Sequence, residues 1–170
     1  VTHALYLLEK LSESSMPFIF KGGTSLLLLL QELRRLSIDI DIIVPKSVKI
    51  AEINEILKNI VRTSSFTRYE EQERHLSQIP KAHFKLFYES PFNQSEVYVL
   101  LDVLFEENPY SRLDSTDIVC PFIDTIPPNV TVKVPSIADI LGDKLTAFAP
   151  NTTGILYDKE KEMEIIKQLF

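Results

Sequence analysis

The chain has 170 residues, of which 45% are hydrophobic and 25% are charged; this composition describes a globular domain with a continuous core and excludes a disordered or fibrous chain. Eighteen basic against 24 acidic residues give a formal charge of −6, which argues against a surface that binds nucleic acid through charge alone. A single cysteine, Cys120, excludes an internal disulfide, and the absence of a long apolar run or a signal peptide predicts a cytoplasmic protein without a membrane segment.

Strands and helices alternate in the first half of the chain. Apolar residues at helical spacing predict one helix from Thr2, as its cap, to about Glu13, and another over 47–62 with a serine cap. Between them the pattern predicts a strand, a glycine turn, a leucine-rich helix and a second strand. The predicted ranges of this unit are Met16 to Phe20, Lys21 to Ser25, Leu26 to Leu36 and Ile38 to Val44.

The second half is predicted to contain a strand pair and two helices. Residues 63–80 are polar and read as irregular. Strands are predicted over 82–89 and 96–105, joined by a turn at 90–95, then near 118–120 and over 130–134. Ser136 and Asp139 have the spacing of a capping box and open a helix to about Phe148; a last helix begins near Asp158. We expect one α/β domain over residues 1–170, and, since the chain lacks an initial Met and stops inside an amphipathic helix, a piece of a longer protein.

Two aspartates interrupt the isoleucine-rich stretch RRLSIDIDII. In a strand, Asp39 and Asp41 would share one face, and Ile38, Ile40 and Ile42 would turn the other face to the core. Neighbouring carboxylates repel each other unless water screens them or a cation lies between them. The stretch therefore allows a solvated edge strand or a site for a hard cation such as Mg²⁺.

Asp102 strengthens the metal interpretation. It lies within the apolar run VYVLLDVLF, where a charged side chain is costly unless it is paired or bound to a metal. The alternative is that Asp102 is a strand-end carboxylate paired with a surface lysine and binds no metal. Three carboxylates on two strands could hold two ions, which suits phosphoryl or nucleotidyl transfer.

The Gly22-Gly23-Thr24-Ser25 turn supplies a complementary element. Glycines let the backbone approach a ligand closely, and the start of the next helix presents free amide groups to phosphates. Its place one helix before the Asp-x-Asp pair predicts a triphosphate site beside the cation site.

Three stretches in this order resemble a known family. FKGGTSLLLLLQELRRLSIDIDII, VLLDVLF and PSIADILGDKLTAF are similar to the polymerase β-like nucleotidyltransferases, and in particular to the AbiEii/AbiGii toxin family of abortive-infection toxin–antitoxin systems. The resemblance extends from about Phe18 to Phe148 and implies an α+β fold with a mixed sheet flanked by helices.

The resemblance also implies roles for particular residues. Asp39, Asp41 and Asp102 would be the catalytic metal ligands of a two-Mg²⁺ site. Lys144 of the DKL segment would lie near the triphosphate and act in catalysis. The remaining nucleotide-binding residues would be Lys21, Gly22, Gly23, Thr24 and Ser37. Asp158 matches poorly a further acid that relatives carry after the DKL helix.

What this implies is a cytoplasmic, Mg²⁺-dependent nucleotidyltransferase toxin. It would move a nucleoside monophosphate from a nucleoside triphosphate to an acceptor hydroxyl, with the 3′ end of tRNA as the acceptor and an antitoxin protein as a partner. Within the same chemistry, the acceptor could be an aminoglycoside-type small molecule or a protein. From another class, the chain could be a catalytically silent interaction module.

Other residues are interpreted as structural. The histidines His3, His75 and His83 show no zinc-like spacing, Cys120 reads as a buried thiol, and Asp143 reads as a helix-surface or supporting residue rather than a ligand. Arg34 and Arg35 read either as solubility residues or as residues that steer nucleic acid. The basic residues from Arg62 to Lys85 are a candidate RNA-binding patch.

Overall fold

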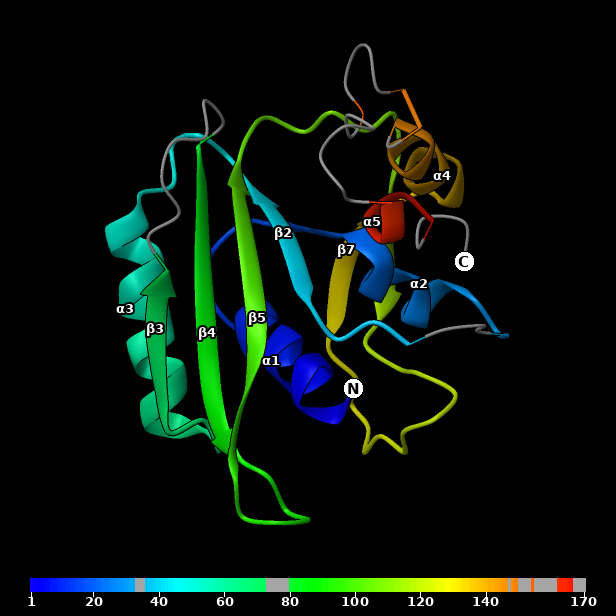
Figure 1. Cartoon of the computed structure of the whole chain (residues 1–170). Helices are drawn as coiled ribbons and strands as arrows, with labels where there is room; N and C mark the ends of the chain where they lie inside the picture. Colours follow the sequence, from blue (N-terminus) through cyan, green and yellow to red (C-terminus); the bar gives the residue numbers. More distant parts are fainter. Residues whose placement is uncertain (33–35, 73–79, 147, 150–153, 155–161, 167–170) are drawn as a thin grey trace.

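A mixed five-stranded sheet organises the computed structural model of the chain (Figure 1). The strands lie in the order β1-β2-β5-β4-β3; β2 and β5 are parallel and the other pairs are antiparallel. A separate antiparallel pair, β6-β7, packs beside β1 through β7. The structure describes residues 1–170 except 33–35, 73–79, 147, 150–153, 155–161 and 167–170. The strands are β1 (Ile19–Lys21), β2 (Ile40–Val44), β3 (Arg68–Gln72), β4 (Lys81–Glu89), β5 (Glu96–Phe105), β6 (Leu113–Asp117) and β7 (Thr131–Pro135).

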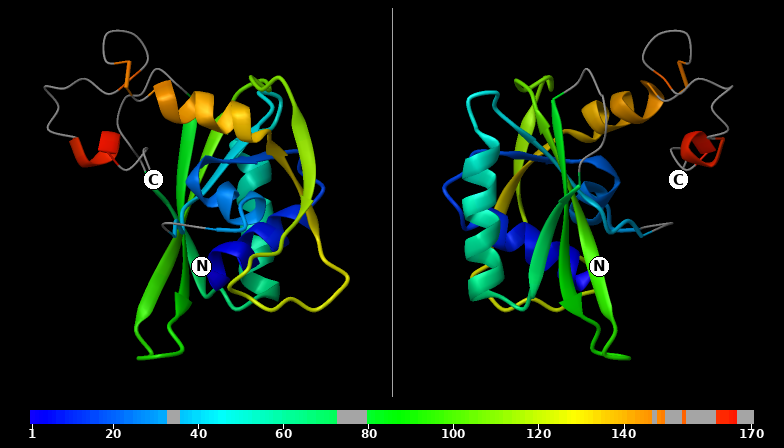
Figure 2. Two further views of the ribbon diagram at one scale, coloured as in Figure 1. Left: turned by 90° about the vertical axis from the view of Figure 1, so that its right-hand side faces the viewer. Right: turned by 60° about the vertical axis from the view of Figure 1, so that its left-hand side comes forward.

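Helices α1 (Thr2–Ser12) and α3 (Ile50–Thr63) cover one face of the five-stranded sheet (Figure 2). Apolar residues at helical spacing form the buried side of each helix, because every third or fourth side chain falls on one face. The buried positions are Leu5, Leu8 and Leu11 in α1 and Ile53, Leu57 and Ile60 in α3. The remaining helices are α2 (Gly22–Leu29), α4 (Ile137–Thr146) and α5 (Glu162–Ile166). In the described part of the chain, no helix combines the length and apolar character needed to cross a membrane.

The sheet face under α1 and α3 forms the main core. Alternate residues of the three central strands point into it and are at most 1% exposed: Ile40, Ile42, Phe84, Leu86, Leu101 and Val103. Each such side chain contributes about 1.5–3 kcal/mol through burial. Since strand residues alternate between faces, the residues between them, including Asp41, His83 and Asp102, point to the opposite face.

The structure confirms the predicted mixed sheet flanked by helices and corrects several details. Helix α2 begins at Gly22, so the predicted glycine turn is already the first turn of the helix, and the helix ends at Leu29. Strand β2 begins at Ile40, and the predicted core residue Ile38 is 50% exposed. The alternation expected of a strand does not apply before Ile40, because that segment has no strand partner.

Other corrections concern caps and polar strands. Helices α1 and α3 are preceded by Val1 and Lys49 and have no side-chain cap, contrary to the predicted Thr2 and serine caps. Strand β3 lies in a segment predicted to be irregular, because its sequence RYEEQ has no apolar alternation. Strand β6 lies at Leu113–Asp117, earlier than the strand expected near 118–120.

Candidate active site

A row of polar side chains crosses the sheet face opposite α1 and α3. In register, Lys21 of β1 pairs with Asp41 of β2, Asp41 with Asp102 of β5, and Asp102 with His83 of β4. Directly paired residues on neighbouring strands point to the same face, with Cβ atoms about 4.5–5.5 Å apart. The predicted carboxylates Asp41 and Asp102, 61 positions apart in the sequence, are therefore neighbours in the two parallel central strands.

Gly22 lets the start of α2 approach Asp41 directly. Its φ of +79° lies in the left-handed region that favours glycine. A Cβ atom at this position would lie 2.3 Å from Oδ2 of Asp41 and 3.0 Å from its Cγ. Any side chain at position 22 would therefore collide with the Asp41 carboxylate, which explains why glycine is required here.

The environment of Asp41 opposes its ionisation. Burial and the neighbouring charge of Asp102 raise the pKa of Asp41 to about 7, with a further contribution from Asp39, while the charges of Lys21 and Lys81 lower it. A cation that binds between Asp41 and Asp102 would stabilise the ionised form of Asp41, because the cation removes the repulsion between the two carboxylate charges.

His83 was predicted to have no functional role, but it contacts this pair. Its Nδ1 lies 2.6 Å from Oδ1 of Asp102, and the side chain is 11% exposed. The strand pattern of the sequence holds a signal that would have found it. The turn at 90–95 joins Glu89 to Glu96, so counting back along the hairpin places His83 opposite Asp102.

Lys21 connects the carboxylate row to α4. Its Nζ lies 3.3 Å from Oδ2 of Asp143 and 6.0 Å from the ring centre of Tyr110. The Tyr110 hydroxyl donates a hydrogen bond of 2.7 Å to the same Asp143 oxygen. Burial, followed by this hydrogen bond, raises the pKa of Tyr110 well above its usual value. The exposed Asp143 carboxylate therefore contacts both Lys21 and Tyr110, and its supporting role at the site stays a prediction.

The first turn of α2 is fixed by two buried hydroxyls. Thr24 Oγ1 donates to the carbonyl oxygen of Asp39 at 2.6 Å, and Ser25 Oγ donates to the carbonyl oxygen of Gly22 at 2.7 Å. The residue before the helix is Lys21, and no side chain caps the first amide groups. Free amide groups at a helix start, next to a lysine, can bind phosphate oxygens.

The structure leaves the predicted roles of three further residues open. Asp39 is exposed and lies just before β2, close enough for its charge to affect Asp41. Ser37 is half-buried in the same segment, and Lys144 is half-buried in the last turn of α4. Their roles in binding metal or nucleotide remain predictions.

The donor set at Asp41 and Asp102 fits Mg²⁺. Among the described residues, no group of three or more His, Cys, Asp or Glu side chains is arranged to hold a metal ion. However, protein-bound Mg²⁺ is usually held by one or two carboxylates together with waters and substrate phosphates. Two adjacent carboxylates of which one has a raised pKa, beside a helix start suited to phosphates, meet that requirement.

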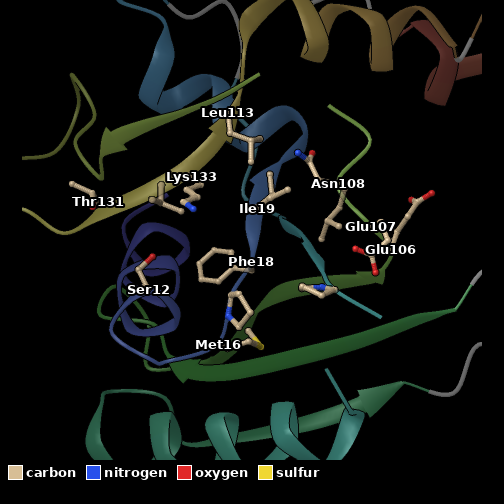
Figure 3. A pocket seen from close by; sticks show the side chains of 14 residues that line it. Ser12, Met16, Phe18, Ile19, Glu106, Glu107, Asn108, Leu113, Thr131 and Lys133 are labelled. Atoms are coloured by element: carbon tan, nitrogen blue, oxygen red, sulfur yellow. The ribbon is translucent and has the colours of Figure 1, made fainter. Parts of the chain in front are cut away.

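The structure has a small hollow at the carboxylate pair and a larger cavity elsewhere. Asp41, Asp102, Lys21, Lys81 and His83 line a hollow of about 100 Å³. A cavity of about 350 Å³ lies elsewhere, with Phe18 and Met16 on one side and Glu106 and Glu107 on the other (Figure 3). The larger cavity has two glutamates and one lysine, Lys133, whereas the smaller hollow combines two paired carboxylates with two lysines beside the start of α2. The chemistry of the side chains, rather than cavity volume, therefore identifies the smaller hollow as the candidate active site.

The remaining predicted residues have structural environments or lie outside the described residues. His3 stacks on Tyr88 with ring centres 3.6 Å apart, and Cys120 is buried as predicted. The residues discussed from the sequence that fall outside the described residues are Arg34, Arg35, Arg74, His75 and Asp158.

Comparisons with known proteins agree with the fold and show the family. The sequence profile of the family described as "Nucleotidyl transferase AbiEii toxin, Type IV TA system" matches residues 5–162. No curated protein matches the chain. Three solved structures have a similar fold. JHP933 from Helicobacter pylori is 18% identical, with a TM-score of 0.55 over 86% of this chain and 53% of that chain. A putative nucleotidyltransferase from H. pylori is 17% identical, with a TM-score of 0.54 over 85% and 55%.

The third is an antigenic nucleotidyltransferase-like protein from Paracoccidioides brasiliensis. It is 16% identical, with a TM-score of 0.59 over 98% of this chain and 72% of that chain. At these identities the likeness shows the fold alone. The chain spans only about half the length of the two H. pylori proteins.

Proposed function

Since the chain belongs to the AbiEii family of nucleotidyltransferase toxins of type IV toxin–antitoxin systems, we propose that it transfers a nucleoside monophosphate from a nucleoside triphosphate to an acceptor hydroxyl. One observation carries the proposal beyond family membership. Asp41 and Asp102 are paired in register on adjacent strands, and Gly22 at the start of α2 lies against Asp41. Cation ligands and a phosphate-binding helix start are thereby combined in one place.

Asp41 and Asp102 would hold Mg²⁺, with Asp39 as a third carboxylate beside them. When bound, Mg²⁺ supplies charge stabilisation for the phosphate oxygens and makes the acceptor hydroxyl more acidic. The raised pKa of Asp41 supports this assignment, because the apo site is electrostatically unfavourable in a way that a divalent cation corrects.

The triphosphate would bind at the start of α2. The amide groups of Gly22, Gly23 and Thr24 and the Lys21 ammonium group provide donors and positive charge for its oxygens. Ser37 and Lys144 are further proposed phosphate ligands. These groups position the α-phosphorus for attack and compensate the charge of the leaving group.

The reaction replaces one phosphorus–oxygen bond with another. The acceptor oxygen forms a bond to the α-phosphorus, and the bond from the α-phosphorus to the oxygen bridging to the β-phosphate breaks. Pyrophosphate leaves with that bridging oxygen, and the hydroxyl proton passes to solvent.

For the acceptor, we propose the 3′ end of tRNA. The sheet face that carries Asp102 also carries Lys81, Lys85 and Tyr98, according to the strand register. The Lys85 Nζ lies 4.4 Å from the ring centre of Tyr98, which is 46% exposed. Cationic and aromatic side chains on one face suit a single-stranded RNA end. We also infer a cognate antitoxin as a partner, since the family belongs to toxin–antitoxin systems.

Label transfer tests this proposal. The chain is incubated with Mg²⁺, each α-labelled nucleoside triphosphate in turn, and a mixture of tRNA and total protein. We expect label to enter RNA with the wild-type chain and not with Asp41→Asn. Label in protein or in a small molecule would replace tRNA with another acceptor, and no label in any fraction would contradict the catalytic proposal.

A further inference from the structure

The buried polar side chains of the described residues lie at the candidate active site. In the parts of the chain that the structure describes, Thr24, Ser25 and His83 are the buried polar side chains. Two of them hold the backbone of the site, at Asp39 and Gly22, and the third contacts the Asp102 carboxylate. Burying a polar group is costly unless it is hydrogen-bonded, so each of these contacts constrains its partner.

We propose that His83 is a positioning residue for nucleotidyl transfer, which orients the Asp102 carboxylate for cation binding. The inference rests on the function proposed above. The contact of His83 Nδ1 with Oδ1 of Asp102 occupies one carboxylate oxygen and leaves Oδ2 available to a divalent cation. The side chain of His83 therefore acts through Asp102 and needs no contact with substrate.

The proposal also sets the direction of this hydrogen bond. A carboxylate that binds a cation is ionised and only accepts, so in the proposed metal-bound site Nδ1 of His83 donates to Asp102. Nδ1 and Oδ1 are 2.6 Å apart, and a hydrogen bond to an ionised acceptor is stronger than a neutral one. Partners of this kind fix the orientation of metal ligands, and their removal typically weakens metal affinity about 10- to 100-fold.

The position of His83 within the sheet makes it a rigid support. Strand β4 lies between β3 and β5, and His83 is in register with Gln72 on one side and with Asp102 on the other. Its ring has little exposure and so few alternative rotamers. Asp102, by contrast, has a side chain that is 31% exposed and would otherwise be free to rotate towards water.

Three substitutions separate positioning from simple packing. The amide of His83→Asn can place a donor near the position of Nδ1. The longer His83→Gln places its amide near Nε2, and His83→Leu removes the donor. His3→Phe serves as the control, since His3 lies on α1 and stacks on Tyr88. The affinity for Mn²⁺ alone is measured by electron paramagnetic resonance and the folded state by thermal unfolding in EDTA.

We expect Mn²⁺ affinity to fall about 10- to 100-fold in His83→Leu and His83→Gln and to stay within about threefold of wild type in His83→Asn and His3→Phe. Equal affinities in the Asn and Gln variants would overturn the proposal, and this comparison stands even if the Leu variant fails to fold. Unchanged affinity in all three variants would also overturn it while leaving the proposed function intact. A wild-type chain that binds no Mn²⁺ would instead overturn both.

Discussion

Replacing Asp41 with Asn should stabilise the metal-free protein at neutral and alkaline pH. The carboxyl has a pKa of about 7 in the folded chain, against 3.8 for an unperturbed aspartate. The folded state therefore binds its proton more tightly than the unfolded state. Stability from this group is fully present below pH 3.8, declines as the pH rises, and is lost once the pH passes 7.

The size of the effect follows from these two pKa values. One pKa unit corresponds to about 1.4 kcal/mol, so ionised Asp41 costs the folded state about 4 kcal/mol at pH 8. Asn removes the charge and nearly preserves the shape. We expect Asp41→Asn to unfold at a higher urea concentration than wild type at pH 8 in EDTA, with less than half of that gain remaining at pH 5.

The assay is urea unfolding of both proteins at pH 5, 6.5 and 8, with and without Mg²⁺. Mg²⁺ should stabilise wild type and have no comparable effect on the variant. Asp117→Asn on β6 is the matched control; its exposed side chain should leave stability within about 0.5 kcal/mol at every pH. A variant that is no more stable than wild type at pH 8, or that gains equally at pH 5 and pH 8, would refute the account of Asp41 as a half-buried carboxyl whose ionised form is destabilised by burial and by Asp102.

Three further outcomes are expected. Gly22→Ala should lose about 2–4 kcal/mol of stability in thermal or urea unfolding, because Gly22 has a left-handed backbone and a Cβ atom there would clash with Asp41. The control Gly142→Ala, whose Cβ atom would meet no atom within 4 Å, should gain about 0.5–1 kcal/mol. Equal effects of the two substitutions would contradict the close approach of Gly22 to Asp41. Mn²⁺ affinity of wild type should fall as the pH drops through about 7, because protons compete for Asp41, and a flat profile from pH 8 to 6 in calorimetry would count against this. Phe84→Ala should cost about 3–5 kcal/mol in urea unfolding, since the ring is fully buried under α1 and α3; a loss below 1 kcal/mol would argue against that core.

The hairpin of β4 and β5 could be predicted from the sequence, because the residues that specify it are close together in the chain. Alternating apolar residues and a polar turn at 90–95 predict both strands, and the turn also sets their register. The parallel pairing of Asp41 with Asp102 is different, since nothing in the local sequence specifies which strand lies beside β2. Before the structure was known, the two aspartates were linked by the cost of a charge in an apolar strand and by the resemblance to the nucleotidyltransferases, and neither signal specifies the pairing of the strands.

Other features depended on contacts that a local pattern does not contain. Strand β3 forms because β4 offers an unpaired edge, although RYEEQ has no apolar periodicity. The Arg68 guanidinium lies 3.5 Å above the Phe87 ring and pairs with Glu96, so contacts across three strands fix its position. The exposure of Ile38 was missed for the converse reason, because an apolar residue was assigned to the core although its segment has no strand partner.

The strand order has a consequence for how the site is assembled during synthesis. Strand β5 is the last of the five in the chain, yet it lies in the centre of the sheet, between β2 and β4. A nascent chain that ends before residue 96 has Asp41 and His83 but no Asp102 to join them. The repelling carboxylates therefore come together only after β5 has left the ribosome, and shorter translation products lack the paired carboxylates on which the proposed nucleotidyl transfer depends.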